Sequence, residues 1–218
     1  MQALPAHLAA AALAALLAVL PLGAAAQPAP QSGRDYSELS PVQPVSTGER
    51  VEVIEFFYYG CPVCYEAQPH IAKWLMRSGP GIAMVRVPAA FTDSSDSFAR
   101  TFYTLSAMNQ IARLHWPVYD NHHFDGKQLN EEKNITDWVA SNGVDRAKFS
   151  ELWNSDEIKA RVESAKKALD TYQVKGVPTF IIDGKYVTSA KQAGGTKEMM
   201  RVVEYLVERA GAERKKAK

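Results

Sequence analysis

The fold is decided by the stretch VEVIEFFYYGCPVC, residues 51–64. Residues 51–57 are rich in β-branched and aromatic side chains and predict a buried strand. A helix is expected directly after it, because Pro62 suits a first helical turn and an apolar stripe at helical spacing continues to the break at 78–80. Residues 82–87 alternate in polarity and predict a second strand, which completes a βαβ unit.

The middle of the chain predicts helices. Apolar side chains recur at helical spacing between about residues 90 and 172, and we expect helix N-caps at Asn134, Asp145 and Ser155. This stretch is too long for a loop, and we interpret it as a helical subdomain inserted between two halves of a larger unit.

The C-terminal part predicts a hairpin and a closing helix. Asp183-Gly184 is a strong turn signal between short strands at 178–182 and 185–187, and Thr196 begins an amphipathic helix. The order βαβ, helices, ββα predicts an α/β layer arrangement.

The two ends of the chain differ from the part between them. An apolar run at 8–20, followed by small residues up to Ala26, predicts a signal peptide over 1–26 that is cleaved near Ala26; an uncleaved membrane anchor is the alternative. The basic residues within 213–218 predict a frayed, solubilising tail. The expected organisation is a signal peptide (1–26), a leader and edge strand (27–50), a first half (51–90), the helical insertion (91–172), a second half (173–212) and a basic tail (213–218).

Composition narrows the function classes. The chain has 218 residues, of which 46% are hydrophobic, and this is enough for one compact domain. Its net charge of +1 predicts no general attraction to nucleic acid or to an anionic membrane. We expect a monomer.

The chain has only two cysteines, in the motif Cys61-Pro62-Val63-Cys64, where a buried strand turns into a helix. Unpaired N–H groups at a helix N-terminus favour a negative charge, so the pKa of the Cys61 thiol should be low. Cys64 lies one turn further along, on the apolar stripe. The context predicts redox chemistry, with Cys61 as the exchanging sulfur and Cys64 as the resolving one.

Two other interpretations of the pair are a structural disulfide and a metal site. A disulfide across four residues gains little from loop entropy. A zinc site needs about four ligands, and no second C-x-x-C is present. The surroundings of His115, His122 and His123 are polar and favour a solvated surface. We therefore expect no metal and no cofactor.

The chain resembles the DsbA family of thioredoxin-fold oxidases. The resemblance rests on Glu55-Phe56-Phe57, on Cys61-Pro62-Val63-Cys64, on Gly176-Val177-Pro178-Thr179 and on the place of the helical insertion, and it covers nearly all of the chain after residue 26. It implies a thioredoxin fold (βαβ plus ββα) with an inserted helical subdomain, a periplasmic location and an oxidising dithiol with an acidic first cysteine.

The resemblance also implies roles outside the cysteine pair. Pro178 matches a cis-proline that faces the disulfide, where the backbone of Val177 can pair with an extended substrate. Glu55 matches a buried acid six residues before Cys61, and its apolar neighbours predict a raised pKa. Its expected role is to accept a proton from Cys64 through water. The alternative places Glu55 on an exposed face.

One position departs from the family. Its best-known dipeptide between the cysteines is Pro-His, whereas this chain has Pro62-Val63. A valine side chain donates no hydrogen bond to the Cys61 thiolate. We expect a higher Cys61 pKa and a weaker oxidant than in a Pro-His relative.

The function expected from the resemblance is to introduce disulfide bonds into unfolded exported proteins, with reoxidation by a DsbB-type, quinone-linked inner-membrane partner. Tyr58, Tyr59 and Val177 are candidate liners of an apolar substrate groove, and a place in the core is the alternative for each. A periplasmic reductase or isomerase, a metal carrier that uses the two cysteines and a chaperone with an idle cysteine pair remain alternatives.

Overall fold

The structure, a computed structural model, describes residues 28–216, so the predicted signal peptide lies outside the described residues. The strands are β1 (Ser37–Glu38), β2 (Val51–Phe57), β3 (Ile82–Pro88), β4 (Thr179–Ile182) and β5 (Tyr186–Ser189). The helices are α1 (Pro62–Arg77), α2 (Asp93–Ala107), α3 (Ile111–His123), α4 (Glu132–Ser141), α5 (Arg146–Trp153), α6 (Asp156–Thr171), α7 (Ala190–Ala193) and α8 (Thr196–Lys216). None of the helices within 28–216 is both long and apolar enough to cross a membrane.

The strands form one mixed sheet in the order β1-β5-β4-β2-β3, in which β2 runs parallel to β3 and antiparallel to β4. All seven residues of β2 are buried, because helices cover both faces of the sheet. Helices α1 and α8 pack against Val51 and Val53 on one face. Helix α6 packs against Ile54 and Phe56 on the other.

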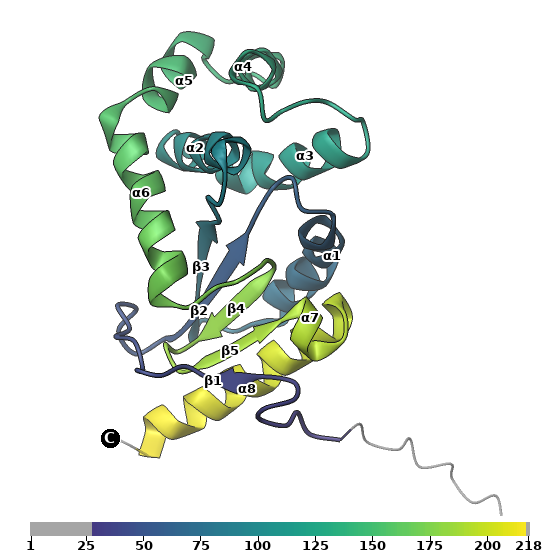
Figure 1. The fold of residues 1–218 in the computed structure, drawn as a ribbon, viewed down its shortest axis with the longest axis vertical. Helices are drawn as coiled ribbons and strands as arrows, with labels where there is room; N and C mark the ends of the chain where they lie inside the picture. The colour runs from purple at the N-terminus through teal and green to yellow at the C-terminus, as the bar shows by residue number, and fades with distance from the viewer. Residues whose placement is uncertain (1–27, 217–218) are drawn as a thin grey trace, which may run out of the picture.

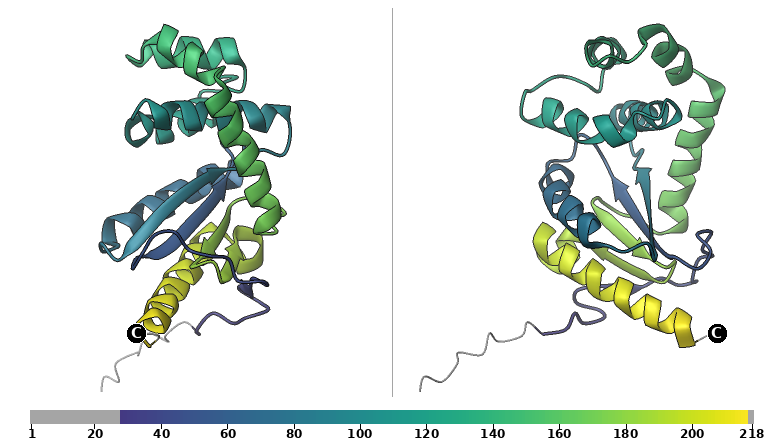
Figure 2. Two further views of the ribbon diagram at one scale, coloured as in Figure 1. Left: turned by 90° about the vertical axis from the view of Figure 1, so that its left-hand side faces the viewer. Right: turned by 180° about the vertical axis from the view of Figure 1, so that it is seen from behind.

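Helices α2 to α5 form a separate layer beyond the carboxyl ends of β2 and β3 (Figure 1). The layer stays apart from the sheet when the molecule is turned, and α6 leads back from it along the sheet (Figure 2). Its aromatic core also contains Phe57 and Cys64, so the insertion shares one core with the end of β2 and the start of α1. The predicted order of βαβ, helical insertion and ββα is confirmed.

Local sequence signals fix most helix starts. Asp145 and Ser155 cap α5 and α6, as predicted, by accepting hydrogen bonds from the backbone three residues on. The N-cap predicted at Asn134 is wrong, because α4 begins at Glu132. The Asn134 amide instead donates to the carbonyl of Gln128, outside the helix. Helix α3 was not predicted as a separate helix, since Pro117 interrupts its pattern.

The Asp183-Gly184 turn joins β4 and β5 as predicted, with positive φ angles of 56° and 63° that suit a hairpin turn of type I′. The backbone of Gln43 lies against Gly184 and donates a hydrogen bond to its carbonyl at 2.9 Å. A side chain at Gly184 would collide with the Gln43 carbonyl, so glycine is needed for both conformation and space.

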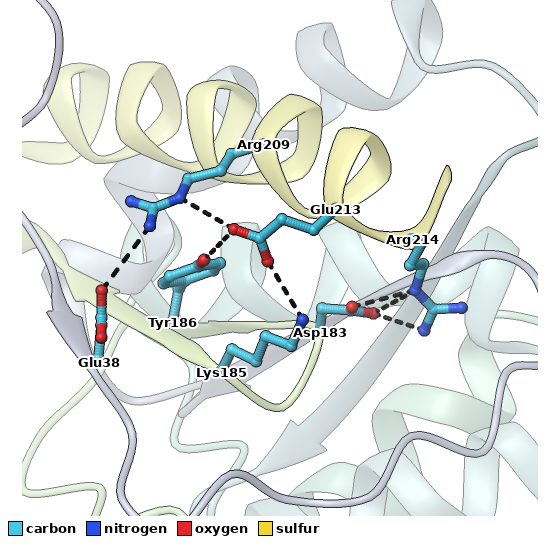
Figure 3. A network of polar contacts seen from close by, with 7 residues as sticks. All are labelled: Glu38, Asp183, Lys185, Tyr186, Arg209, Glu213 and Arg214. Carbon is cyan, nitrogen blue, oxygen red and sulfur yellow. Dashed lines mark hydrogen bonds and ion pairs between the residues drawn. The ribbon is translucent and has the colours of Figure 1, made fainter. Parts of the chain in front are cut away.

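The predicted fraying of the tail is wrong for the described part, because α8 continues to Lys216 and is tied down by ion pairs (Figure 3). Arg214 Nε donates to buried Asp183 at 2.9 Å. The adjacent Glu213 accepts from Tyr186 Oη at 2.6 Å and from Lys185 Nζ at 3.1 Å. Asp183 lies in the β4–β5 turn and Glu213 lies on α8, so the network joins the hairpin to the last helix.

Candidate active site

Cys61 is the N-cap residue of α1, at the point where β2 has turned into the helix. Its Sγ accepts a hydrogen bond from the backbone N–H of Cys64 at 3.2 Å. Cys61 is half-buried, whereas Cys64 is fully buried, and both are free thiols. The structure therefore places one reachable and one shielded sulfur at the start of α1.

The environment separates the acidities of the two thiols. A hydrogen bond from the Cys64 side chain is the largest cause that lowers the pKa of Cys61 to about 7, and the backbone N–H groups of Cys64 and Val63 lower it further. Burial raises the pKa of Cys64 well above its usual value, and the Cys61 sulfur and the Glu55 carboxyl add to this effect. Near neutral pH the reduced pair thus favours a thiolate on Cys61 and a thiol on Cys64.

The loop before β4 lies against the exposed sulfur. The Val177–Pro178 peptide bond is cis, and the Cys61 thiol donates to the Val177 carbonyl at 3.7 Å. A pocket of about 330 Å³ adjoins this loop, with Val177 and Pro178 in its wall and Lys175 and Lys191 at its sides. The loop thus places a backbone acceptor beside Cys61 and has an open space along it.

Pro62 and Val63 occupy the exposed first turn of α1, and Val63 is 41% exposed. The Val63 side chain has no polar atom, so its backbone N–H is its only means of stabilising the Cys61 thiolate.

Glu55 is fully buried on β2, on the face that α1 covers, so the exposed alternative is wrong. Arg86 Nε donates to Glu55 Oε2 at 2.9 Å, and Gln68 Nε2 donates to Oε1 at 3.1 Å. The Gln68 amide also donates to the backbone carbonyl of Cys64 at 3.3 Å. Burial raises the pKa of Glu55, while Arg86 and Gln68 oppose that rise. Gln68 therefore connects the buried acid to the residue that carries the shielded sulfur.

Arg86 and Gln68 were not found from the sequence. The signal for Arg86 is the strand register: β2 and β3 pair in parallel so that Glu55 lies directly opposite Arg86. Gln68 lies four residues after Cys64 on the inner face of α1, where a polar side chain needs a buried partner.

Two neighbouring polar side chains, Tyr59 and His115, lie in the core. Tyr59 is fully buried and lines no surface groove, and its Oη lies 2.8 Å from Nδ1 of His115. His115 is only 9% exposed, and its ring packs edge-on against Phe57. The solvated position predicted for His115 fails because α3 turns this residue toward the aromatic core.

A second histidine of α3 also reaches the site. His123 Nε2 lies 2.7 Å from the carbonyl of Tyr59, and its ring stacks on Tyr65 in the first turn of α1. The Tyr65 hydroxyl donates to Asp120 at 2.8 Å. These contacts fix the start of α1 against the helical layer.

A thioredoxin-type sheet, a C-x-x-C pair at the mouth of its first helix and a cis-proline loop against the first sulfur define the class of thiol:disulfide oxidoreductases. The sequence profile of the DSBA-like thioredoxin domain matches residues 81–207. The chain belongs to the DsbA family.

Named relatives agree with this family over nearly the whole chain. The thiol:disulfide interchange protein DsbA of Pseudomonas aeruginosa is 38% identical over 206 residues, which are 94% of this chain and 98% of that protein. The protein of the same name from Pseudomonas syringae pv. tomato is 35% identical and covers 94% of this chain and 97% of its own length. The crystal structure of Pseudomonas aeruginosa DsbA superposes with a TM-score of 0.80 at 37% identity, covering 85% of this chain and 96% of that one.

Proposed function

We propose that this chain introduces disulfide bonds into newly exported proteins by exchange at Cys61 and Cys64. The observation that carries the proposal is that the two cysteines differ in burial and in pKa. Cys61 is partly accessible with a pKa of about 7, and Cys64 is buried with a raised pKa. Such a pair favours the reduced form with a Cys61 thiolate, and this makes its disulfide oxidising.

The reaction has two exchanges. A client thiolate attacks Cys61 Sγ of the Cys61–Cys64 disulfide, that bond breaks, and Cys64 leaves with the electron pair and takes up a proton. A second client thiolate then attacks the client sulfur of the mixed disulfide, and Cys61 leaves as a thiolate. The client loses two electrons and gains a disulfide, while the enzyme becomes the dithiol.

We assign to Glu55 the exchange of this proton with Cys64 through water. Burial raises the pKa of Glu55, so this carboxyl takes up a proton more readily than an exposed one, close to a sulfur that needs a proton when it leaves. Gln68 holds Glu55 toward Cys64, and Arg86 keeps the carboxylate form accessible for the reverse transfer.

We assign client binding to the loop that carries Val177 and Pro178. An extended client segment can pair with the backbone of Val177, which brings its cysteine to Cys61. The adjoining pocket offers room for a neighbouring client side chain.

Export and reoxidation complete the proposal. Residues 1–26 act as a signal peptide that is cleaved near Ala26, which delivers the chain to the periplasm. In reoxidation the Cys61 thiolate attacks a disulfide of a DsbB-type, quinone-linked inner-membrane protein, one partner cysteine leaves as a thiolate, and Cys64 then attacks Cys61 Sγ of the mixed disulfide, loses its proton and releases the second partner cysteine. The Cys61–Cys64 disulfide is restored, and the two electrons pass from the partner's dithiol to the quinone.

The direct test uses a reduced, unfolded protein that regains activity only when its disulfides form. The oxidised chain is expected to restore that activity in proportion to the amount of chain added, since each chain carries one disulfide. The reduced chain serves as the control. A chain that instead accelerates reduction of the folded client and leaves the unfolded one unchanged would be a reductase.

Val63→His is expected to lower the pKa of Cys61 and make the pair more oxidising. A histidine on the exposed first turn can donate to the thiolate, which stabilises the reduced form. A fall of about one pKa unit corresponds to a rise of about 30 mV in the redox potential. Equilibration with glutathione measures it. Val63→Phe, which adds a ring without a donor, should leave the potential near that of the natural chain, and an equal rise in both variants would contradict the explanation.

A further inference from the structure

A second pocket, with a volume of about 560 Å³, lies between α1 and α3. These two helices run beside each other where the sheet meets the helical layer (Figure 1). Leu75 from α1 and Ile111 and Trp116 from α3 give it apolar walls. Gln68 and Arg86 line this space and hold Glu55 in the proposed proton exchange, but neither Cys61 nor Cys64 lines it.

His115 lines this pocket and has an unpaired nitrogen. Its Nε2 is buried and has no hydrogen-bond partner among residues 28–216, although the residue is nine-tenths buried. Nδ1 is occupied by the Tyr59 hydroxyl, which has no other partner within those residues. The hydroxyl must donate to Nδ1, because its proton would otherwise be buried and unsatisfied. We therefore assign the hydrogen of the neutral ring to Nε2, and this leaves a donor without an acceptor.

Arg86 supplies a charge to the same pocket. Its Nε is bound to Glu55, while Nη1 and Nη2 have no partner in the described part of the chain. The side chain is 25% exposed, and no other charged residue within 28–216 lines this space. The guanidinium therefore keeps two nitrogens free for an anion, and a carboxylate fits such a fork well.

We propose that this pocket binds a small aliphatic carboxylic acid. Its carboxylate accepts hydrogen bonds from the free Nη1 and Nη2 of Arg86 and lies beside the His115 ring in the pocket wall. Its alkyl chain lies against the apolar walls. A cation is disfavoured by Arg86, and a neutral alcohol of equal length lacks the charge that the guanidinium pairs with.

The neighbouring acid gives the proposal an internal check. Glu55 already accepts a hydrogen bond from the Arg86 guanidinium. The negative charge of Glu55 therefore opposes the binding of a second carboxylate to Arg86. Replacing Glu55 by Gln removes that charge and frees Arg86 for the ligand. Glu55→Gln should therefore bind the acid several-fold more tightly than the natural chain.

The experiment titrates the natural chain with decanoate below its micelle concentration and follows the ¹⁵N resonance of His115 Nε2 together with the heat of binding. We expect saturation at one site, a shifted Nε2 resonance and affinity for decanol at least tenfold weaker. Decanol binding as tightly as decanoate, or saturation that leaves His115 unshifted, would overturn the proposal.

Variants locate the site. Ala112→Phe and Ala72→Phe each place a ring into the pocket from an opposite wall, on exposed helix positions that should tolerate it, and should each weaken decanoate at least tenfold. Ala160→Phe adds the same ring to an exposed position of α6 away from the pocket and should bind like the natural chain. Unchanged affinity in both pocket variants would refute the site. Disulfide exchange at Cys61 is tested separately and does not depend on this result.

Discussion

Replacement of Cys61 by Ser is expected to reduce disulfide transfer to the uncatalysed background. The half-buried Cys61 is the one sulfur of the pair that a client can reach, and a serine hydroxyl cannot form a disulfide. The measurement is the recovery of activity by a reduced, unfolded client. Transfer by Cys61→Ser at a rate close to that of the natural chain would contradict the assignment.

Cys64→Ser is the matched variant, because it removes the other sulfur from the same turn. It retains the exchanging Cys61 but cannot resolve a mixed disulfide, so a covalent complex with a disulfide-bearing client should accumulate on a non-reducing gel. In the natural reduced chain, alkylation of Cys61 should rise with a midpoint near pH 7, since its pKa is about 7, while Cys64 stays unreactive there. Equal alkylation of both thiols at neutral pH would show that burial does not separate them.

Arg86→Met is expected to destabilise the fold by about 3–5 kcal/mol at neutral pH, because it leaves a buried carboxylate without its cation. Glu55 is fully buried, and its remaining hydrogen bond comes from Gln68. The double variant Glu55→Gln/Arg86→Met removes both charges and should recover most of the loss. Urea unfolding of the three proteins measures the difference.

The pH dependence of Arg86→Met has a definite sign. Burial already raises the folded pKa of Glu55 above 4.5, and loss of Arg86 raises it further. A group whose pKa is raised on folding stabilises the folded state fully below its unfolded pKa, and that stabilisation is lost as the pH rises through the folded value. The deficit of Arg86→Met should therefore be small below about pH 4.5 and grow toward neutral pH. A deficit that is constant across this range would show that lost packing, not the carboxylate, is responsible.

The parts of the fold that were predicted correctly are those with strong local signals. The β-branched run of β2, the apolar stripe of α1 and the turn at Asp183-Gly184 each restrict the backbone within a few residues. The caps at Asp145 and Ser155 act over three residues for the same reason. The position of Cys61 at a helix N-terminus follows from two adjoining elements, so its acidity could be argued before the fold was known.

The wrong expectations about His115 and Arg214 concern contacts between distant elements. His115 looked solvated because its sequence neighbours are polar, but α3 buries it against Phe57 and Tyr59. Arg214 looked like part of a frayed tail, yet its partner Asp183 lies in a hairpin 31 residues earlier. A partner that lies far away in the sequence leaves no signal in the residues next to His115 or Arg214.

The sequence by itself determined that a cysteine pair opens a helix after a buried strand, because strand, turn and helix preferences act between near neighbours. Only the tertiary structure decided which groups surround that pair. The register of β2 against β3 places Arg86 opposite Glu55, and the packing of α3 against α1 leaves a pocket with His115 in its wall. These contacts have large energetic effects because the groups are buried. A charge or a polar nitrogen that is removed from water is stabilised only by the partner that the fold places beside it.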